Sequence, residues 1–445
     1  MQKISVFGLG PVGLVTAVCF AKRGYEVVGI DPDSRRVELI QNAQAPFFEP
    51  SLADYLTETI KNGKLRATSD SMANANSDFT YITVGTPSGE DGSIDLTYIR
   101  SAAAAIGKSL RNKEGYQLVL VKSTVIPGTA REVVKPIIEQ ESGKLLGRGF
   151  GLCSNPEFLR EGNAIYDSDF PDRIVIGGQQ DDLNRLETFY REFFGEKTPP
   201  IIRTSFENAE LTKYANNSFL AMKVSFINMI ANLCQKTTGA DVEDVAKGIG
   251  LDKRIGALFL RPGLGWGGSC FPKDLKAISA YGKKINVKTT LVDAAIDVND
   301  NQPLKAVEMA KKLLGGDLRD KKIAVLGLAF KPDTDDIREA VSIPMIKEIL
   351  AANGEVVAYD PAAMPNTRKV LQDTIKYATN PANCIEQADC CIIVTEWEEF
   401  KKISPTVFLK TMKRPIVVDG RRIYDPSVFR KAGVIFSAIG LGDNQ

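Results

Sequence analysis

The chain has 445 residues, of which 44% are hydrophobic and 25% are charged, which is typical of a soluble protein with two or three domains. Its 56 basic residues nearly balance 55 acidic ones, so the net charge gives no indication of binding to nucleic acid or to a membrane surface. The sequence contains no histidine. A Cys–His pair and a histidine zinc site are therefore excluded, and proton transfer falls to lysine, carboxylates or water.

The cysteines and the apolar stretches indicate where the protein works. Seven cysteines are dispersed through mostly apolar contexts without a CxxC pair, which favours reduced thiols in a cytoplasm over disulfides and predicts no metal site. The apolar stretch 4–20 is interrupted by glycines and by Pro11, and it lacks a basic leader and a cleavage site. We therefore expect neither a signal peptide nor a membrane span.

The first motif is a glycine-rich turn between a strand and a helix. Residues 4–8 read as a strand, the turn Gly-Leu-Gly-Pro-Val-Gly occupies 8–13, and a helix follows to about residue 23. A second strand at 26–30 ends at Asp31. This order predicts a dinucleotide site in which the glycines let the backbone approach a pyrophosphate. Asp31 would accept from the ribose hydroxyls and repel a 2′-phosphate, which favours NAD over NADP.

Further strands predict that this motif begins a larger sheet. Residues 79–84, 118–122 and 150–154 read as strands, separated by helical stretches such as 98–110. The alternation predicts a doubly wound parallel sheet. From about 205 to 237 the pattern changes to one long helix with apolar residues at intervals of three and four, which is typical of a domain connection or a dimer interface.

A second α/β unit begins near Lys321. Residues 323–329 repeat the pattern of 4–10, and 355–361 repeat that of 26–32, although the second and third glycines are lost. The fold class we expect is α/β, with two Rossmann-like doubly wound domains joined by a long central helix and a helical middle domain. The expected domains are an NAD-binding Rossmann domain (1–200), a central helical or dimerisation domain that carries Cys270 (201–305) and a second Rossmann-like domain (306–445), which we expect to hold a different nucleotide from the first.

Cys270 is the residue that points beyond a simple alcohol dehydrogenase. A thiol beside a nicotinamide can form a thiohemiacetal that gives up a second hydride and leaves a thioester for water to hydrolyse. Glycines flank Cys270 and suggest open surroundings, and a helix that starts at Pro272 would favour the thiolate. The alternative is that Cys270 is a small buried apolar residue.

Six motifs in order along the chain carry a family resemblance. They comprise the glycine turn at 8–13, Lys-Ser-Thr at 122–124, Asn-Pro-Glu-Phe-Leu-Arg-Glu-Gly at 155–162, Lys213 with Asn217, the cysteine segment at 267–274, and 330–338. Together they resemble the UDP-glucose/GDP-mannose dehydrogenase family over nearly the whole chain. The resemblance implies an NAD-dependent, four-electron oxidation of the C6 alcohol of a nucleotide sugar to a carboxylate.

The resemblance also implies roles for individual residues. Lys213 and Asn217, four apart on one helix face, would stabilise an oxyanion at C6, and Asp274 would hold the water that accepts the proton. Glu157 would activate the water that hydrolyses the thioester, although it could instead cap a neighbouring helix. Without this context, the Lys213–Asn217 spacing would indicate only a solvated helix face.

Arg254 is similar to an arginine that reaches the substrate from a neighbouring subunit, so we expect a homodimer; an exposed arginine at a helix end is the alternative. The expected catalytic residues are Cys270, Lys213, Asn217, Asp274, Glu157 and Thr124. The expected cofactor site comprises Gly8, Gly10, Val12, Gly13, Asp31, Arg36, Thr86, Thr124, Glu161, Lys273 and Arg338. The expected substrate site comprises Phe158, Leu159, Arg160, Glu161, Lys213, Asn217, Arg254, Phe259, Gly263, Gly267, Phe330, Lys331 and Arg421.

The segment around Arg254 resembles the UDP-glucose branch of the family, which implies UDP-glucose as the substrate and UDP-glucuronate as the product. Arg261-Pro262-Gly263 also resembles the GDP-mannose branch, so GDP-mannose or a UDP-N-acetylhexosamine remains an alternative. A two-electron β-hydroxyacid dehydrogenase would share the first motif but would need neither the thiol nor the second α/β unit. A catalytically silent nucleotide-sugar sensor would have no chemical need for Cys270, Lys213 and Asp274 together.

Overall fold

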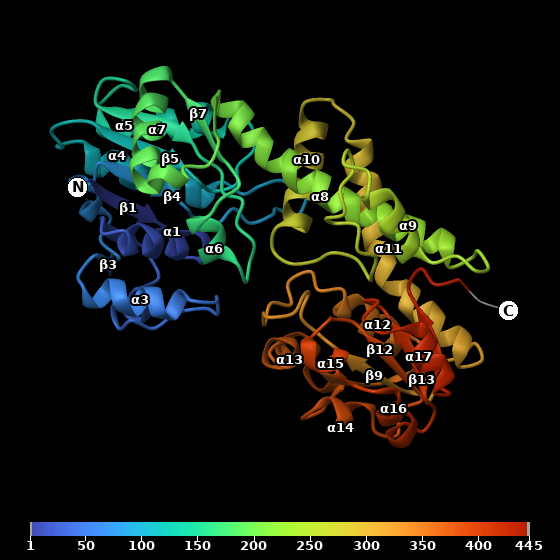
Figure 1. The fold of residues 1–445 in the computed structure, drawn as a ribbon. Coiled ribbons are helices and arrows are strands. Elements are labelled where there is room, and N and C mark those ends of the chain that lie inside the picture. Colours follow the sequence, from blue (N-terminus) through green and yellow to red (C-terminus); the bar gives the residue numbers. More distant parts are fainter. Residues whose placement is uncertain (1, 443–445) are drawn as a thin grey trace. The chain divides into compact units, whose positions relative to one another are not determined.

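The computed structural model describes residues 2–442 and divides into two compact units, Met1–Asn216 and Asn217–Gln445. Each unit contains one sheet, and the ribbon in Figure 1 follows the chain through both. No helix within residues 2–442 has the length and apolar character needed to span a membrane.

The first unit is built on an eight-stranded sheet with the order β3-β2-β1-β4-β5-β6-β7-β8. Neighbouring strands are parallel except for β6 and β7, which run antiparallel. The strands are β1 (Lys3–Phe7), β2 (Glu26–Ile30), β3 (Leu65–Thr68), β4 (Phe79–Ile82), β5 (Gln117–Val121), β6 (Phe150–Ser154), β7 (Ile174–Gly178) and β8 (Ile201–Thr204). The doubly wound sheet expected from the alternating pattern is confirmed.

Helices cover both faces of this sheet. They are α1 (Pro11–Lys22), α2 (Ser34–Gln41), α3 (Leu52–Lys61), α4 (Thr97–Leu110), α5 (Lys135–Ser142), α6 (Ala164–Asp169) and α7 (Gln180–Phe194), with the 3-10 turns η1 (Ser71–Asn76) and η3 (Gly195–Lys197) and the π-helical turn η2 (Ala130–Val134). One hydrophobic core joins the sheet to α1, α3, α6 and α7, and a second joins it to α4 and α5. The sheet is therefore buried on both faces, as a parallel sheet requires.

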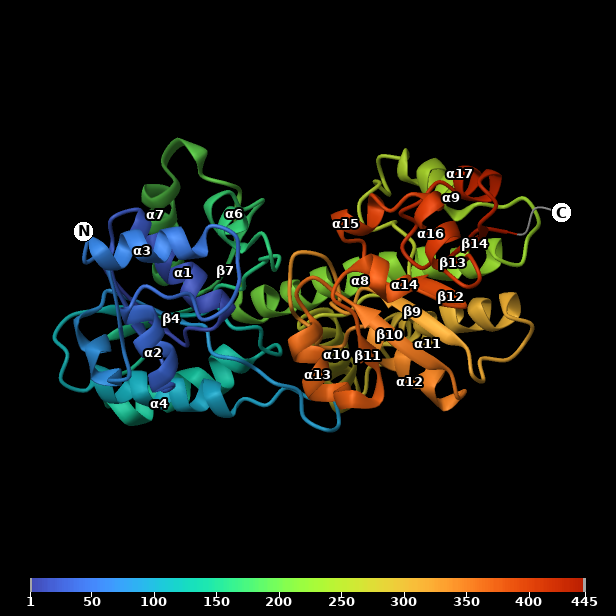
Figure 2. The same ribbon diagram turned by 90° about the horizontal axis from the view of Figure 1, so that it is seen from below.

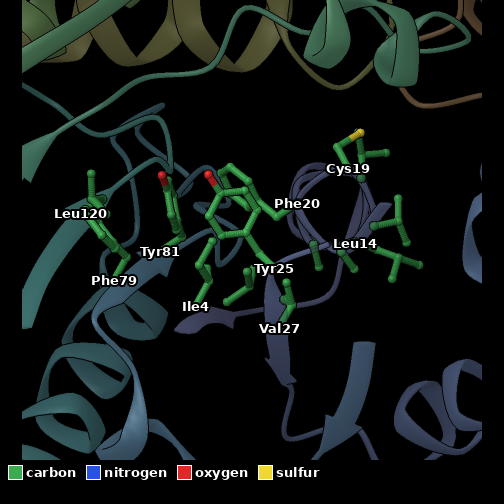
Figure 3. Packing of buried hydrophobic residues seen from close by; sticks show 14 of the residues in the cluster. Ile4, Leu14, Cys19, Phe20, Tyr25, Val27, Phe79, Tyr81 and Leu120 are labelled. Carbon is green, nitrogen blue, oxygen red and sulfur yellow. The ribbon is translucent and has the colours of Figure 1, made fainter. Parts of the chain in front are cut away.

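Aromatic rings fill the core beneath α1. Phe20 lies with its ring centroid 5.1 Å from that of Tyr81 and 6.3 Å from that of Tyr25, and Figure 3 shows these rings gathered above Ile4 and Val27 of the strands. Tilted and edge-on ring pairs of this kind add to the stabilisation that burial provides. The packing fixes α1 on the sheet and so fixes the glycine turn that precedes it.

A single helix, α8 (Phe206–Cys234), carries the chain from the first unit into the second. It is 29 residues long and confirms the continuous helix expected over 205–237. The second unit adds the helices α9 (Val242–Gly250), α10 (Phe271–Lys284), α11 (Thr290–Leu313), α12 (Ser342–Ala351), α13 (Met364–Leu371), α14 (Pro381–Ile385), α15 (Glu398–Lys401), α16 (Pro405–Thr411) and α17 (Pro426–Lys431), with the 3-10 turn η4 (Gln372–Thr374).

The sheet of the second unit has the order β11-β10-β9-β12-β13-β14, and all its neighbouring strands are parallel (Figure 2). Its strands are β9 (Lys322–Leu326), β10 (Glu355–Tyr359), β11 (Lys376–Tyr377), β12 (Cys390–Ile393), β13 (Ile416–Asp419) and β14 (Ile435–Ala438). This strand order is that of a Rossmann sheet, so the second Rossmann-like domain predicted from the repeat is confirmed.

The repeat extends to single hydrogen bonds. The Leu9 N–H donates to Asp31 over 2.6 Å, and the Leu328 N–H donates to Asp360 over 2.7 Å at the corresponding place in the second unit. Asp360 is fully buried and also accepts from the indole N–H of Trp397. Its Oδ2 thus accepts from Leu328, Ala329 and Trp397, while its Oδ1 accepts from the Ala362 and Ala363 N–H groups. Because both oxygens are used within the protein, Asp360 has a structural role and is not available to a ribose.

Candidate active site

The glycine turn at the end of β1 leaves space where a phosphate would have to approach. Gly8 has φ +91°, and a Cβ on it would lie 2.9 Å from the Cα of Val84; a Cβ on Gly13 would lie 1.8 Å from the Gly8 carbonyl oxygen. Gly10 is different, because a Cβ there would meet nothing within 4 Å. The first and third glycines thus serve packing, and the second leaves the start of α1 open to a pyrophosphate.

Asp31 follows β2 and lies beside this turn. Its two carboxylate oxygens accept from the Leu9 N–H, from the Asp33 N–H over 2.9 Å and from the Arg36 guanidinium over 2.9 Å. The carboxylate is therefore held at the carboxyl end of β2, where the ribose of a dinucleotide lies in such sheets. Arg36 neutralises part of its charge.

Substituting Asp31 by asparagine is expected to raise the KM for NAD about tenfold and to weaken discrimination against NADP, because the amide loses the charge that repels a 2′-phosphate. Steady-state kinetics with both cofactors would measure this. Asp33→Asn is the matched control, since Asp33 caps α2 through the Arg35 and Arg36 N–H groups and asparagine caps equally well. Unchanged cofactor preference in Asp31→Asn would contradict the assigned role.

Glu157 and Lys213 form a buried ion pair in the first unit. The Nζ of Lys213 lies 2.8 Å from the Oε1 of Glu157, and the two side chains are 4% and 8% exposed. The other oxygen of Glu157 accepts from the Leu159 N–H. Burial alone would raise the pKa of Glu157, but Lys213, the Leu159 N–H and Lys122 together lower it below its ordinary value. The carboxylate is therefore ionised at neutral pH.

Two further cations, Arg173 and Lys122, lie near this pair. The guanidinium of Arg173 lies 3.7 Å from the ring centroid of Phe158, and Lys213 lies 5.5 Å from the same centroid. Burial lowers the pKa of Lys122 to about 8, with Lys213 acting in the same direction and Glu157 opposing it. The cluster holds more positive than negative charge, which suits an anionic reaction intermediate.

The remaining predicted residues of the first unit lie in the loops that follow β4, β5 and β6. Arg160 forms an ion pair with Asp167, with 2.5 Å between Nη2 and Oδ1. The backbone oxygen of Thr124 accepts from the Thr86 hydroxyl over 3.0 Å, so two predicted cofactor residues are in direct contact. Glu49, which is buried, accepts from the Gly162 and Ala164 N–H groups and fixes the end of the loop that carries Glu161.

In the second unit, Asn217 contacts Asp274. The side-chain N–H of Asn217 donates to Oδ2 of Asp274 over 2.6 Å, and Lys273 pairs with Oδ1 at 2.6 Å. Asp274 is 1% exposed. Both of its oxygens are thus held in place by residues that the sequence had singled out.

Cys270 occupies the N-cap position of α10, the helix that contains Asp274. It is exposed, whereas the other six cysteines are buried. The N-terminal end of a 14-residue helix stabilises negative charge on the sulfur, which favours a reactive thiolate. The interpretation of Cys270 as a small buried apolar residue is therefore wrong.

Buried amides hold the segment that leads to Cys270. The Gly263 N–H donates to Asn228 over 2.8 Å, Gln302 donates to the Gly263 carbonyl over 2.9 Å, and Asn299 exchanges hydrogen bonds of 2.7 and 3.0 Å with the backbone of Trp266. No sequence motif predicts a role for Asn228, Asn299 or Gln302. The partners lie 33 to 39 residues apart in the chain, so no local pattern indicates them.

The glycines before Cys270 are required by close packing against the segment 330–339. A Cβ on Gly267 would lie 2.3 Å from the Glu339 carbonyl oxygen, and one on Gly268, which has φ +81°, would lie 2.8 Å from the ring of Phe330. The Gly268 N–H also donates to the Arg338 carbonyl over 3.0 Å. The expectation that these glycines leave open space around Cys270 is wrong. Glycine is required at these two positions because the segment packs directly against the segment 330–339.

Arg421 connects β12 to the same segment. Its Nε donates to the Val394 carbonyl over 2.6 Å and its Nη1 to the Gly265 carbonyl over 3.2 Å. Burial lowers the pKa of Arg421, and its Nη2 is buried without a hydrogen-bond partner among residues 2–442. A buried guanidinium nitrogen with unused donors suits a substrate oxygen.

Arg254 pairs with a near neighbour in the chain, and Lys331 lies against the ring of the residue before it. The side chain of Arg254 is 88% exposed and pairs with Asp252 two residues before it at 2.7 Å. Lys331 lies 5.4 Å from the ring centroid of Phe330. Phe259 has φ +64° and is 37% exposed. The side chains of Arg254 and Phe259 are therefore accessible from solvent.

Family models match three successive segments of the chain. Residues 2–194 match the NAD binding domain, 207–301 the central domain, and 324–426 the UDP binding domain of the UDP-glucose/GDP-mannose dehydrogenase family. The chain is 43% identical over 443 residues to the UDP-glucose 6-dehydrogenase of Haloferax volcanii, covering 98% of this chain and 100% of that protein.

Solved structures agree with the family models. A UDP-glucose dehydrogenase from Pyrobaculum islandicum is 38% identical with a TM-score of 0.90, over 99% of this chain and 98% of that one. A UDP-D-ManNAc dehydrogenase from Pyrococcus horikoshii is 29% identical with a TM-score of 0.87, over 99% of this chain and all of that one. The chain belongs to the UDP-glucose/GDP-mannose dehydrogenase family, and its cofactor is NAD.

Proposed function

We propose that the protein oxidises the C6 alcohol of UDP-glucose to the carboxylate of UDP-glucuronate. The observation that carries the proposal is the exposed Cys270 at the N-terminus of α10, one turn before a buried Asp274 that Asn217 and Lys273 hold. Relatives that are 39–43% identical over nearly the whole chain support UDP-glucose over other nucleotide sugars, since they are UDP-glucose 6-dehydrogenases. The expected boundaries at about 200 and 305 separate the segments matched by the three family models.

The first unit supplies the features that an NAD site needs. The open space above Gly10, the carboxylate of Asp31 and the contact between Thr86 and Thr124 suit the pyrophosphate, the ribose and the nicotinamide end respectively. NAD, when bound, accepts a hydride in each of the two oxidations. Glu161 is a further proposed cofactor residue of this unit, and the sequence motifs add Lys273 and Arg338 of the second unit to the proposal.

In the first oxidation the chain must take a proton from the C6 hydroxyl and stabilise the oxygen that results. We assign the stabilisation to Lys213, whose ammonium is buried, and to the amide of Asn217. The proton passes to a water held by the carboxylate of Asp274. The product of this step is the C6 aldehyde.

Cys270 then acts as the nucleophile. Its thiolate adds to the aldehyde carbon, and the carbonyl oxygen takes back a proton from the water held by Asp274 to give a thiohemiacetal on the sulfur. Loss of a second hydride to NAD, and of the hydroxyl proton to the same water, gives a thioester, and Lys213 and Asn217 stabilise the oxygen again. Glu157, which its neighbours keep ionised, takes a proton from the water that cleaves the thioester and releases the carboxylate and the thiolate.

The yield of NADH per sugar tests the whole sequence. With limiting UDP-glucose and excess NAD, the reaction should run to two NADH and one UDP-glucuronate per sugar. One NADH per sugar would instead indicate an alcohol dehydrogenase with an idle cysteine. Reaction with GDP-mannose or UDP-N-acetylmannosamine but not with UDP-glucose would keep the chemistry and replace the substrate.

A dimer accounts for an apolar stripe on α8. Phe219, Phe226, Met229 and Leu233 are between 42% and 62% exposed and recur at intervals of seven, three and four residues. This heptad-like spacing places them on one face of the helix, where a second copy would bury them. Arg254 would reach the substrate diphosphate of the partner subunit. The seven free cysteines support the expected reducing, cytoplasmic location.

Mixing two variants with different defects, assayed at a UDP-glucose concentration far below the KM of Arg254→Ala, tests the shared site. Arg254→Ala should raise the KM for UDP-glucose by about 10- to 100-fold, because a charged hydrogen bond to phosphate is lost. If Arg254 acts across the dimer, Arg254→Ala reassembled with Cys270→Ser recovers about a quarter of wild-type activity, since half the dimers are mixed and one of their two sites is intact. No recovery, with mixed dimers verified by two affinity tags, would place Arg254 in its own subunit's site or outside the reaction.

A further inference from the structure

Glu210 is a buried carboxylate that the proposed chemistry does not use. It lies on α8 and is 3% exposed. Its Oε2 accepts from the Gly128 N–H over 2.7 Å, and its Oε1 accepts from the Ala130 N–H over 2.9 Å and from the Ser154 hydroxyl over 3.0 Å. Three donors from two other elements thus converge on one side chain of α8.

The backbone that Glu210 holds follows directly on Thr124. Gly128 has φ +93°, and Thr129 closes a turn by donating from its hydroxyl to the Ile126 carbonyl over 2.6 Å. Ala130 begins the π-helical turn η2, so its N–H has no helical partner before it. Without the carboxylate, two buried N–H groups in this turn would lose their acceptor, which a folded chain rarely tolerates.

The same face of α8 carries the catalytic groups. Lys213 lies three residues after Glu210 and Asn217 seven residues after it, and all three are between 3% and 5% exposed. A spacing of three and four places these residues above one another on a helix. The contact between Glu210 and the turn therefore sets the height and rotation of α8 at the turn that precedes Lys213.

We propose that Glu210 is a positioning residue for the proposed oxidation, which clamps the segment 124–130 against α8 and thereby holds Lys213 in place relative to Thr124 and Glu157. This inference rests on the proposed function and deepens it. Only a carboxylate with both oxygens free to accept can satisfy three donors, whereas glutamine has one accepting oxygen and would turn an amide N–H toward a backbone N–H.

The negative charge of Glu210 is unfavourable in its buried environment. Burial raises the pKa of Glu210 from its ordinary value of 4.5 to about 7; Glu207 on the same helix adds to the rise, and the Ala130, Gly128 and Ser154 donors oppose it. Two charged residues, Arg131 and Glu132, follow Ala130 in the turn η2. Arg131 interacts electrostatically with Glu210 and forms an ion pair with Glu207. Ser154, which faces Glu210 from β6, is uncharged.

This shift separates a positioning role from a purely structural one. A proton on Glu210 turns one accepting oxygen into a donor, so the clamp is complete above about pH 7 and weakened below it. The folded state binds this proton more tightly than the unfolded state does, so stability falls as pH rises from about 4.5 to about 7. As the pH rises toward 7, the activity should therefore increase, whereas the contribution of Glu210 to the stability of the fold should decrease.

The test compares the full-length wild type with Glu210→Gln and, as the matched control, Glu207→Gln. Glu207 lies one turn earlier on α8, is 37% exposed, and forms a surface pair with Arg131. The measurements are kcat with UDP-glucose between pH 6 and 9, deuterium exchange of 124–134, and urea unfolding at the same pH values. Wild type and Glu207→Gln should show an acid limb of kcat near pH 7.

In Glu210→Gln we expect kcat at pH 8 to fall about tenfold, the acid limb to vanish, and exchange in 124–134 to accelerate about tenfold. Ser154→Ala supplies a second variant, because removal of one of the three donors should move the limb up by about half to one pH unit while the protein still folds. An acid limb that persists in Glu210→Gln, or unchanged exchange in 124–134, would overturn the proposal. A wild type inert toward UDP-glucose would overturn the proposed function instead.

Discussion

Replacing Cys270 with serine is expected to abolish production of UDP-glucuronate, with kcat reduced by roughly 10³-fold or more. A serine hydroxyl is not ionised near neutral pH, and the N-terminus of α10 cannot make it so. The aldehyde would then have no covalent tether from which the second hydride could leave. Single-turnover experiments should show at most one NADH per active site, followed by slow release or hydration of the aldehyde.

Alkylation provides an independent measurement on the same residue. Iodoacetamide should label the wild type at Cys270 first, because this is the exposed cysteine among seven, and activity should fall in proportion to labelling. Cys234→Ser is the control, since Cys234 is buried in the same unit, where burial raises the pKa of its thiol. If Cys270→Ser still yielded two NADH per sugar at an appreciable rate, the thioester route would be excluded.

The sheets were predictable because each strand is a short apolar run that must be buried. Strands at 26–30 and 150–154 were placed to the residue, and the repeat between 4–10 and 323–329 corresponds to β1 and β9 of two Rossmann sheets. The antiparallel neighbour β7 and the edge strand β8 were not predicted, since strand direction depends on the connection and not on the composition of the strand.

The residues of the site were predictable only where they belong to a sequence motif or are spaced by about one turn of a helix. The glycine turn, Lys213 with Asn217, and Cys270 before a helix are local patterns with a chemical reason. Arg173 beside Phe158, Asn228 on Gly263 and Glu210 on Gly128 are contacts between residues distant in the chain. Such partners are chosen by the tertiary fold, so the second layer of the site became visible only in the structure.

Burial also altered the meaning of residues that the motifs contain. Lys122 was noted as part of Lys-Ser-Thr and received no role, yet burial lowers its pKa to about 8 beside Glu157 and Lys213. Gly267 and Gly268 were interpreted as a source of open space and are instead the condition for contact with Glu339 and Phe330. In both cases the role of the residue depends on the atoms that surround it in the fold, which spacing along the sequence does not show.

Glu157→Gln is expected to stop the reaction after both oxidations have occurred once. The amide retains the shape of the side chain and can accept from Lys213, so Cys270 should still form the thioester. The amide cannot take a proton from the hydrolytic water, and steady-state turnover should fall by about 10²- to 10⁴-fold. Rapid mixing should therefore show a burst of two NADH per subunit, and mass spectrometry of the quenched protein should find the nucleotide sugar acylated on Cys270.

The stability of Glu157→Gln should also change, because the substitution breaks the buried ion pair with Lys213. Loss of the negative charge at 2.8 Å leaves the Lys213 ammonium buried with a neutral acceptor, for which we expect a decrease in the free energy of unfolding of about 1–3 kcal/mol. Glu49→Gln is the matched control: it also removes a buried carboxylate, one that holds the backbone of the same loop, so it should destabilise the fold without producing a burst. A burst of one NADH in Glu157→Gln would move Glu157 to the second oxidation, and the absence of any burst would place it at or before the first. Only a burst of two NADH assigns it to thioester hydrolysis.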